Sequence, residues 1–383
     1  MSQHFETGLL DRRVTTGVDF LRGVFAILVV FAHATAVVQE YHGAEAAATP
    51  LGRLLGVTLR QGLVWVIGFF VISGFCIQHS TAAAMLSSGR IDLGRYARAR
   101  VSRIFPFYLI GLAFALTAMA LRTRPDVNLP KTIIALTMTQ GALGCIPSFE
   151  NSWSLTNEMF YYVVYGVLLW RWRGGMKSLF IGGAVLSLGM TAACLIAWIA
   201  LGKPVPGVFA FWTIPLQMLI WLGGAALVHY WRPLSAAATP VRGLWPALAL
   251  SFVVVYFFYT RLWEGGVRLV EMELVNLAWL PFFCLLLLSL GHMAWLERPG
   301  VRTAAAKLGL SSYPLYLLHS PLQDMLRSLL HPLQWFGQMP PVMQWSIHVI
   351  VPVAFCLTLG VPVEQRLLAW RKQWLKKTGP ACA

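Results

Sequence analysis

Acidic residues are scarce in this 383-residue sequence, which holds 15 Asp and Glu against 30 Lys and Arg and has a formal net charge of +15 at pH 7. Charged residues of both signs make up only 12% of the chain, whereas soluble domains usually carry about 25%. Hydrophobic residues reach 57%, so water cannot be the main solvent. The basic residues lie between long apolar stretches, and this arrangement indicates the cytoplasmic face of a membrane protein and excludes a nucleic-acid-binding surface.

Regularly spaced cysteines are also lacking. The six cysteines are scattered, mostly inside apolar runs, and no C-x-x-C pair occurs. This pattern indicates neither a disulfide framework nor a structural zinc site, and we expect no metal. No repeat, linker or low-complexity tract divides the chain. The sequence therefore predicts a single transmembrane domain over residues 1–383, with a short basic cytoplasmic tail at 364–383.

Ten apolar stretches are long enough to cross a bilayer, since about 20 mostly apolar residues span a hydrocarbon core of roughly 30 Å as a helix. These stretches lie near 17–38, 57–79, 104–121, 153–170, 178–201, 207–230, 244–260, 274–294, 308–329 and 341–363. An eleventh apolar run, 132–146, contains or adjoins Gly141, Gly144 and Pro147. These residues suit a re-entrant or interfacial element that does not cross.

The distribution of positive charge favours ten crossings, because Lys and Arg near span ends collect on the cytoplasmic side. With ten crossings and cytoplasmic N- and C-termini, 21 of the 30 Lys and Arg lie inside and 9 lie outside. A crossing at 132–146 would move the C-terminal basic cluster outside. A cleaved signal peptide is disfavoured because the first apolar run is long and carries Arg22 and His33. We expect an all-α polytopic bundle.

Ionisable side chains inside the predicted spans are few, and each costs about 2.5–3.5 kcal/mol to insert, so each is a candidate for function. Arg22 and His33 are eleven residues apart, which is about 16 Å of helix rise and close to three turns, so they share one face. Arg22 is either a snorkelling anchor or part of a site. His33 lies deeper and is either a structural histidine bonded to a carbonyl or a functional base, since both its ring nitrogens need partners.

Glu158 and the pair Arg100 and Arg103 each have both a structural and a functional interpretation. Trp153 suits an aromatic residue at the membrane interface, and Glu158 lies about two turns into the fourth span, at a depth similar to that of His33. Glu158 is either a helix-start carboxylate favoured by the helix dipole or a carboxylate that orients a catalytic histidine. Arg100 and Arg103 are either a positive-inside signal or a clamp for an anionic cofactor.

The ninth span combines polar side chains with two prolines. Tyr316 and His319 are three residues apart and share a face, while the prolines would leave backbone carbonyls free to line a cavity. A polar cluster that only packs the bundle is the alternative. Asp324 and Arg327 are expected to pair with each other, and His348, which has no evident neighbour, is expected to be structural.

Five motifs follow one another along nearly the whole chain, and together they resemble the membrane acyltransferase-3 family. They are Asp19-Phe20-Leu21-Arg22-Gly23 leading to His33, Phe69-Phe70-Val71-Ile72-Ser73-Gly74-Phe75, Arg100-x-x-Arg103-x-x-Pro106, Trp153-Ser154-Leu155-x-x-Glu158-x-Phe160-Tyr161 and Ser312-Tyr313-x-Leu315-Tyr316-Leu317-x-His319. The resemblance implies a ten-helix membrane enzyme that moves an acyl group, most often acetyl from acetyl-CoA. The implied acceptor is a hydroxyl of a sugar, glycan, lipid-linked saccharide, antibiotic or related molecule. Longer relatives carry a fused extracytoplasmic esterase-like domain that is not seen here, which leaves the acceptor open.

The resemblance and the chemistry of the residues together assign roles. An alcohol is a poor nucleophile near pH 7, so a base must take its proton as it attacks the thioester. We expect His33 to be that base and Glu158 to fix its tautomer. Arg22, Arg100 and Arg103 would bind the phosphates of cytoplasmic acyl-CoA. The remaining substrate or oxyanion candidates are Asp19, Ser73, Trp153, Ser154, Tyr313, Tyr316 and His319.

A proton-coupled transporter or flippase of a glycoconjugate is the alternative function, because it could use the same buried charges as a proton relay. Transporters are often built from internal repeats, and none is seen. A purely structural membrane protein is a third alternative, but it would retain these buried charges without a function for them. The expected partners are acyl-CoA as a substrate, a carbohydrate or glycolipid acceptor and the bilayer, with no permanently bound cofactor. Arginine outnumbers lysine 23 to 7, which favours a GC-rich bacterial genome and location in the bacterial inner membrane.

Overall fold

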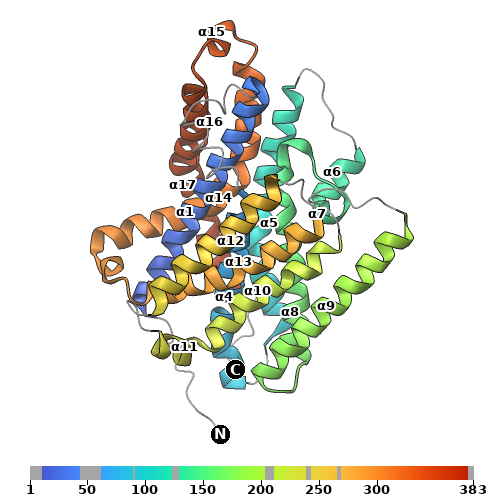
Figure 1. Ribbon diagram of the computed structural model, residues 1–383, viewed down its shortest axis with the longest axis vertical. Helices are drawn as coiled ribbons and strands as arrows, with labels where there is room; N and C mark the ends of the chain where they lie inside the picture. Colours follow the sequence, from blue (N-terminus) through green and yellow to red (C-terminus); the bar gives the residue numbers. More distant parts are fainter. Residues whose placement is uncertain are drawn as a thin grey trace. The chain divides into compact units, whose positions relative to one another are not determined.

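Every secondary-structure element that the computed structural model describes is a helix (Figure 1). The described residues are 11–43, 62–88, 91–122, 129–202, 211–238, 243–264 and 269–377. The elements are α1 (Arg12–His42), α4 (Gly62–Ser88), α5 (Leu93–Ala120), α6 (Leu129–Leu136), α7 (Gln140–Leu143), η1 (Pro147–Ser152), α8 (Trp153–Arg171), α9 (Met176–Ala200), α10 (Thr213–His229), α11 (Trp231–Ala237), α12 (Trp245–Glu264), α13 (Leu269–Leu290), η3 (Ala294–Glu297), α14 (Pro299–Leu330), α15 (Gln334–Gly337), α16 (Pro341–Phe355), η4 (Cys356–Gly360) and α17 (Val361–Lys377).

All ten apolar stretches predicted from the sequence lie on helices, although the first residues of 57–79 and 207–230 fall outside the described ranges. Six described helices are long and apolar enough to cross a membrane, and α10 with α11, bent by 78°, would make a seventh. The prediction of an all-helical membrane protein is confirmed. The number of ten crossings and the cytoplasmic position of both termini stay predictions.

The apolar run 132–146 does not form one long helix. It is divided between α6, of 8 residues, and α7, of 4 residues, and Met138 between them has a positive φ of 53°. Eight residues rise only about 12 Å, far less than the hydrocarbon core. The Tyr108 hydroxyl donates to the carbonyl of Ala135 (2.6 Å) and accepts from Gln140 Nε2 (2.8 Å), which holds both short helices to α5. Their re-entrant placement in a membrane stays a prediction.

The chain divides into two compact units, each built from separated segments. Unit 1 contains Met1–Leu21, Ile67–Ala97 and Asn157–Ala306, and unit 2 contains Arg22–Val66, Arg98–Thr156 and Lys307–Ala383. The boundaries fall inside α1, α4, α5, α8 and α14, so the motif residues are shared between the units. The single domain therefore stays a prediction. The described part of the expected basic tail, residues 364–377, lies on helix α17.

In unit 1, two glycines bring the backbones of α4 and α10 into contact. A Cβ at Gly74 would fall on the carbonyl oxygen of Trp221, and a Cβ at Gly224 would fall on the carbonyl oxygen of Val71. Small residues permit such close approach between membrane helices, where packing drives association. The crossing places Ser73 beside the Trp221 indole, whose Nε1 donates to Ser73 Oγ at 3.1 Å.

In unit 2, a glutamine side chain compensates for a proline. Pro352 lacks the N–H that would bond the carbonyl of His348 within α16. Gln323 Nε2 on α14 donates to this carbonyl at 3.0 Å and to the carbonyl of Val30 on α1 at 3.2 Å. One buried amide group therefore joins three helices. The π-helical turn η4 follows, and a Cβ at Gly360 would lie only 2.8 Å from Pro314 Cβ, so α14 packs tightly against it.

Candidate active site

Two histidine rings meet inside unit 2. His33 on α1 and His319 on α14 have ring centroids 4.8 Å apart with their planes at 80°. His319 is fully buried, whereas His33 is half-buried. The sequence predicted each residue as a candidate but did not predict their contact. The pairing brings the candidate base together with the motif histidine of α14.

The hydrogen bond of His319 defines its tautomer. Its Nδ1 lies 3.0 Å from the carbonyl oxygen of Leu315, and a carbonyl only accepts, so Nδ1 carries the proton. In the neutral ring, Nε2 then keeps a lone pair. This buried nitrogen has no hydrogen-bond partner among the described residues, an arrangement that costs about 1–3 kcal/mol. The pair thus contains an available basic nitrogen at a buried position.

Two predicted oxyanion candidates lie beside this histidine. The hydroxyl oxygens of Ser154 and Tyr316 are 2.6 Å apart, and the Tyr316 hydroxyl donates to the carbonyl of Asn151 at 3.0 Å. The Tyr316 ring centroid is 6.1 Å from that of His319. Asn151 Nδ2 donates to the carbonyl of Tyr316 and, at 3.5 Å, to that of Leu317. Asn151, which the sequence did not single out, therefore orders this polar group.

Two of the arginine candidates, Arg100 and Arg103, lie in a group with Arg371 and the buried carboxylate of Glu364, which we call the arginine cluster. Arg103 forms an ion pair with Glu364, whose side chain is 1% exposed, and its guanidinium lies 4.9 Å above the Tyr313 ring. Arg371 donates to the carbonyl of Ala99 at 3.0 Å and interacts electrostatically with Arg100, Arg103 and Glu364. The sequence missed Glu364 and Arg371 because both lie in the segment interpreted as a basic tail. The structure thus brings Arg103 and Arg371 to one carboxylate, with Arg100 near Arg371.

Three further predicted residues, Arg22, Asp19 and Trp153, are divided between the two units. Arg22 is half-buried in unit 2, Asp19 is half-buried in unit 1, and Trp153 is buried. Trp153 was expected at a membrane interface, and its burial shows that it packs inside the protein. Their roles in substrate binding stay predictions.

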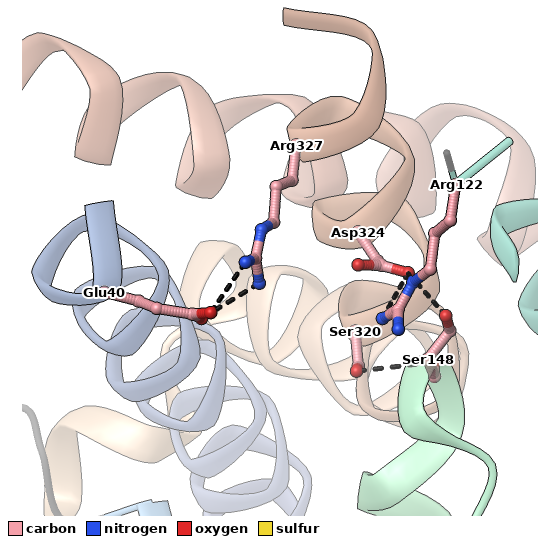
Figure 2. Close-up of polar contacts among 6 residues, drawn as sticks. All are labelled: Glu40, Arg122, Ser148, Ser320, Asp324 and Arg327. Carbon is pink, nitrogen blue, oxygen red and sulfur yellow. Dashed lines mark hydrogen bonds and ion pairs between the residues drawn. The ribbon is translucent and has the colours of Figure 1, made fainter. Parts of the chain in front are cut away.

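Figure 2 shows a second polar group in unit 2, formed by Glu40, Arg122, Ser148, Ser320, Asp324 and Arg327. Asp324 accepts a hydrogen bond from Arg122 Nε at 2.8 Å and another from the Ser148 hydroxyl. Arg327 binds Glu40 through two bonds of 2.9 and 2.6 Å. The predicted pairing of Asp324 with Arg327 is wrong. Arg327 forms a bidentate guanidinium–carboxylate pair with Glu40, a geometry stronger than a single contact. Asp324 pairs instead with Arg122.

His348 has neighbours that were not evident from the sequence, and its expected structural role stays a prediction. His348 is fully buried, its Nε2 lies 3.4 Å from His331 Nε2, and its ring meets the ring of Phe336. His331 follows the end of α14, and the chain turns back through α15 before α16 begins. Helical spacing alone cannot predict a contact that depends on such a turn.

Glu158 belongs to unit 1, where it is bound by two hydroxyl groups. Ser73 and Tyr162 both donate hydrogen bonds to its carboxylate, and Trp221 Nε1 donates to Ser73. The motif residues of α4 and α8 are therefore brought together within this unit, as a carboxylate bound by two hydroxyl donors, one of which accepts a hydrogen bond from Trp221. The prediction that Glu158 orients His33 joins the two units and stays a prediction.

A family model described as an acyltransferase domain, that of the acyltransferase-3 family, matches residues 15–363. The chain belongs to the acyltransferase-3 family. It is an acyltransferase enzyme of the O-acetyltransferase-like kind, and its apolar helices make it an integral multi-pass membrane protein. A Rhizobium radiobacter protein described as protein 2 in the picA locus is 28% identical over 198 residues, covering 46% of this chain and 90% of that protein. No solved structure gives a significant match.

The family match contains every site residue of this acyltransferase that the motifs predicted, from Asp19 to His319. Glu364 and Arg371 lie just beyond the last matched residue. Their contacts with Arg103 and Ala99 become visible only when α17 is placed beside α5 in the folded chain. The carboxylate at the arginine cluster is therefore a feature that neither the motifs nor the family match identifies.

Proposed function

We propose that this acyltransferase moves an acetyl group from cytoplasmic acetyl-CoA to a hydroxyl of a sugar, glycan or glycolipid acceptor in a bacterial inner membrane. The observation that carries the proposal is the pairing of His33 with His319: the Nε2 atom of His319, which has no partner among the described residues, is a hydrogen-bond acceptor beside the imidazole of His33. An acyl transfer to an alcohol requires a base, and His33 is the base that we propose.

In the proposed reaction, His33 takes the proton of the acceptor hydroxyl as its oxygen attacks the thioester carbon. A C–O bond forms, the C–S bond breaks, and the proton passes from His33 to the leaving thiolate of CoA. His33 is the more exposed of the two residues, so it suits contact with substrate. The Nε2 lone pair of His319 would accept a hydrogen bond from the His33 imidazolium and lower the energy of that transient cation.

The order of residues along two helices supports a donor on one side and an acceptor on the other. Residues 103–120 of α5 rise about 26 Å, nearly the thickness of a hydrocarbon core, with the arginine cluster at one end and Arg122 beyond the other. On α14, His319 lies about 9 Å of rise beyond Tyr313 and about 7.5 Å before Asp324. In the ten-crossing topology the arginine cluster is cytoplasmic, and the flexible arm of CoA would extend toward His319.

Sided membrane vesicles test this function. We expect inside-out vesicles that contain the protein to release free CoA from externally added acetyl-CoA, faster when a saccharide acceptor is present, whereas intact right-side-out vesicles should not. Vesicles from cells without the protein are the control. Movement of a glycoconjugate across the membrane without consumption of acetyl-CoA would instead support the transporter. Equal release from both vesicle orientations would contradict the cytoplasmic donor site.

Replacing Glu364 with Gln should strengthen acetyl-CoA binding, because the carboxylate occupies Arg103 where the donor phosphates would bind. We expect the dissociation constant to fall about threefold or more, since removing a competing charge leaves the arginines free for phosphate. Arg103→Ala should weaken binding by ~1.5 to 3 kcal/mol, the usual value of a charged hydrogen bond. Equilibrium binding of labelled acetyl-CoA measures both effects.

The matched control is Glu40→Gln, which removes the carboxylate that pairs with Arg327 in the other polar group of unit 2. It should leave the acetyl-CoA dissociation constant within twofold of wild type. Weaker donor binding in Glu364→Gln would mean that Glu364 holds Arg103 in its binding position and does not compete with the donor.

A further inference from the structure

Unit 1 contains a buried chain of polar side chains that the proposed reaction does not use. Asn157 Nδ2 donates to Gln217 Oε1 at 2.9 Å, and Gln217 Nε2 donates to both carboxylate oxygens of Glu273 at 3.0 Å. Each of the three residues lies four positions after the first residue of its helix, in α8, α10 and α13 respectively. In the ten-crossing topology all three helices begin on the extracytoplasmic side, so this chain lies near the outer surface.

Next to this chain, several buried polar atoms have no hydrogen-bond partner of ordinary geometry among the residues that the structure describes. They are Asn157 Oδ1, the Tyr161 hydroxyl, both side-chain atoms of Asn276 and Trp279 Nε1. All four side chains are at most 1% exposed. Each buried polar group without a partner destabilises the folded protein. Such a concentration in one place indicates a site that a polar ligand completes.

These atoms belong to one group. Tyr161 follows Asn157 by one turn of α8. Its hydroxyl lies near the Asn157 side chain, in a contact looser than an ordinary hydrogen bond, and interacts electrostatically with Glu273. Asn276 follows Glu273 by one turn of α13, and its side chain lies near the Glu273 carboxyl in a contact that is likewise looser than an ordinary hydrogen bond. Trp279 follows Asn276 by a further turn. The unsatisfied atoms therefore extend inward from the Asn157–Gln217–Glu273 chain.

The kinds of atom present select the class of ligand. The Glu273 carboxylate would repel an anion. The indole and amide N–H groups are hydrogen-bond donors and cannot coordinate a simple cation. Hydroxyl groups both donate and accept, so they match the mixture of donors and acceptors. Aromatic rings provide apolar walls, since Tyr161 packs on Phe70 and Trp279 on Phe282, with centroids 5.5 and 5.4 Å apart. A sugar presents such hydroxyls together with apolar C–H faces.

We propose that Asn157, Tyr161, Gln217, Glu273, Asn276 and Trp279 form the binding site for a neutral, hydroxyl-rich saccharide, which is the acyl acceptor. The identification of this saccharide as the acyl acceptor rests on the proposed acyl transfer. Saccharide binding itself requires no acyl donor. Buried water molecules held by the same atoms are the competing interpretation.

The test uses the full-length protein in lipid nanodiscs and three probes that differ in charge: methyl α-D-glucopyranoside, glucuronic acid and glucosamine. Binding is followed by calorimetry without acetyl-CoA. The neutral glycoside should bind most tightly, and Asn276→Leu and Glu273→Gln should each raise its dissociation constant about tenfold or more. In the CoA-release assay the same variants should raise the KM for glycoside by a similar factor and leave the KM for acetyl-CoA within twofold.

The matched control is Ser289→Ala, a buried polar position on the same helix whose hydroxyl bonds only its own backbone, at Leu286. Its glycoside binding should equal that of wild type. Melting temperatures identify variants that fail to fold, and Glu273→Gln, which keeps the size of the side chain, serves if Asn276→Leu does not fold. Unchanged glycoside binding in a folded variant would support buried water and overturn the proposal.

The remaining outcomes separate the site from the reaction. Preference for glucuronic acid or glucosamine, or no binding of any probe to wild type, would overturn the saccharide site. Glycoside binding that the variants weaken, without any CoA release, would support the site and contradict the proposed acyl transfer. Glycoside-dependent CoA release with an unchanged glycoside KM in both variants would support the transfer and overturn this site.

Discussion

Acyl transfer should be lost as completely in His33→Asn as in His33→Ala. General-base assistance typically contributes 10²- to 10⁴-fold to a rate, and we expect a loss of about that size in turnover. Asn can keep a hydrogen bond but cannot take a proton, so a structural histidine would tolerate Asn far better than Ala. CoA release by purified protein of normal thermal stability measures the effect.

His348→Asn is the matched control, because His348 is also a buried histidine of unit 2 that contacts a second histidine. It should retain most of the wild-type turnover. If His33→Asn keeps more than about a tenth of the wild-type rate, the loss is too small for removal of a general base. His319 would then be the base, and His319→Asn would show the full loss instead.

The structure gives a reason to expect that His33→Ala will still fold. The ring lies beside Gly62, the first residue of α4, where an added Cβ would sit 3.9 Å from Cδ2 and 4.0 Å from Nε2. The side chain is half-buried and has an aromatic contact with His319. Its removal therefore deletes a polar group from a partly accessible position and creates no unpaired charge.

Gly74→Ala and Gly224→Ala should each destabilise the protein more than an ordinary surface substitution. A Cβ at either position would overlap a carbonyl oxygen of the facing helix, and backbone cannot move aside as a flexible side chain can. Overpacking of this kind costs about 1–3 kcal/mol and sometimes more. Separation of α4 from α10 would also draw Ser73 away from Trp221. Thermal unfolding in detergent, followed by tryptophan fluorescence, measures the loss.

Gly189→Ala on α9 is the control, with an expected change of opposite sign. A Cβ at Gly189 meets no atom within 4 Å, and alanine favours a helix by about 0.4–1 kcal/mol relative to glycine where it fits. Equal melting temperatures for Gly74→Ala, Gly224→Ala and wild type would contradict the close crossing of α4 and α10.

The helices of this protein were predictable from sequence because apolar runs of about 20 residues have few other stable structures. The partners of individual side chains were less predictable. Helical spacing indicates which residues share a face of α14, but it does not identify the neighbouring helix, so Asp324 was assigned to Arg327 instead of Arg122. For the same reason the His33–His319 contact was not predicted.

Two acidic residues escaped prediction because each lies close to the end of an apolar stretch. Glu364 follows the tenth stretch among many basic residues, and Glu273 immediately precedes the eighth. A charge at such a position has an ordinary explanation as the boundary between membrane and water. Only the folded chain shows that both carboxylates are buried, one beside Arg103 and the other beside Gln217.

The irregular segment Pro147–Ser152 has a consequence for how the enzyme moves. Phe149 within it has non-helical backbone angles, yet Ser148, Phe149, Asn151 and Ser152 are all buried. Hydrogen bonds from Ser148 to Asp324 and from Asn151 to the carbonyl of Tyr316 fasten it to α14. Segments that open easily have few buried contacts and solvated backbone. This connection therefore behaves as a fixed wall and not as a lid, and any gate that admits substrate to unit 2 must move elsewhere.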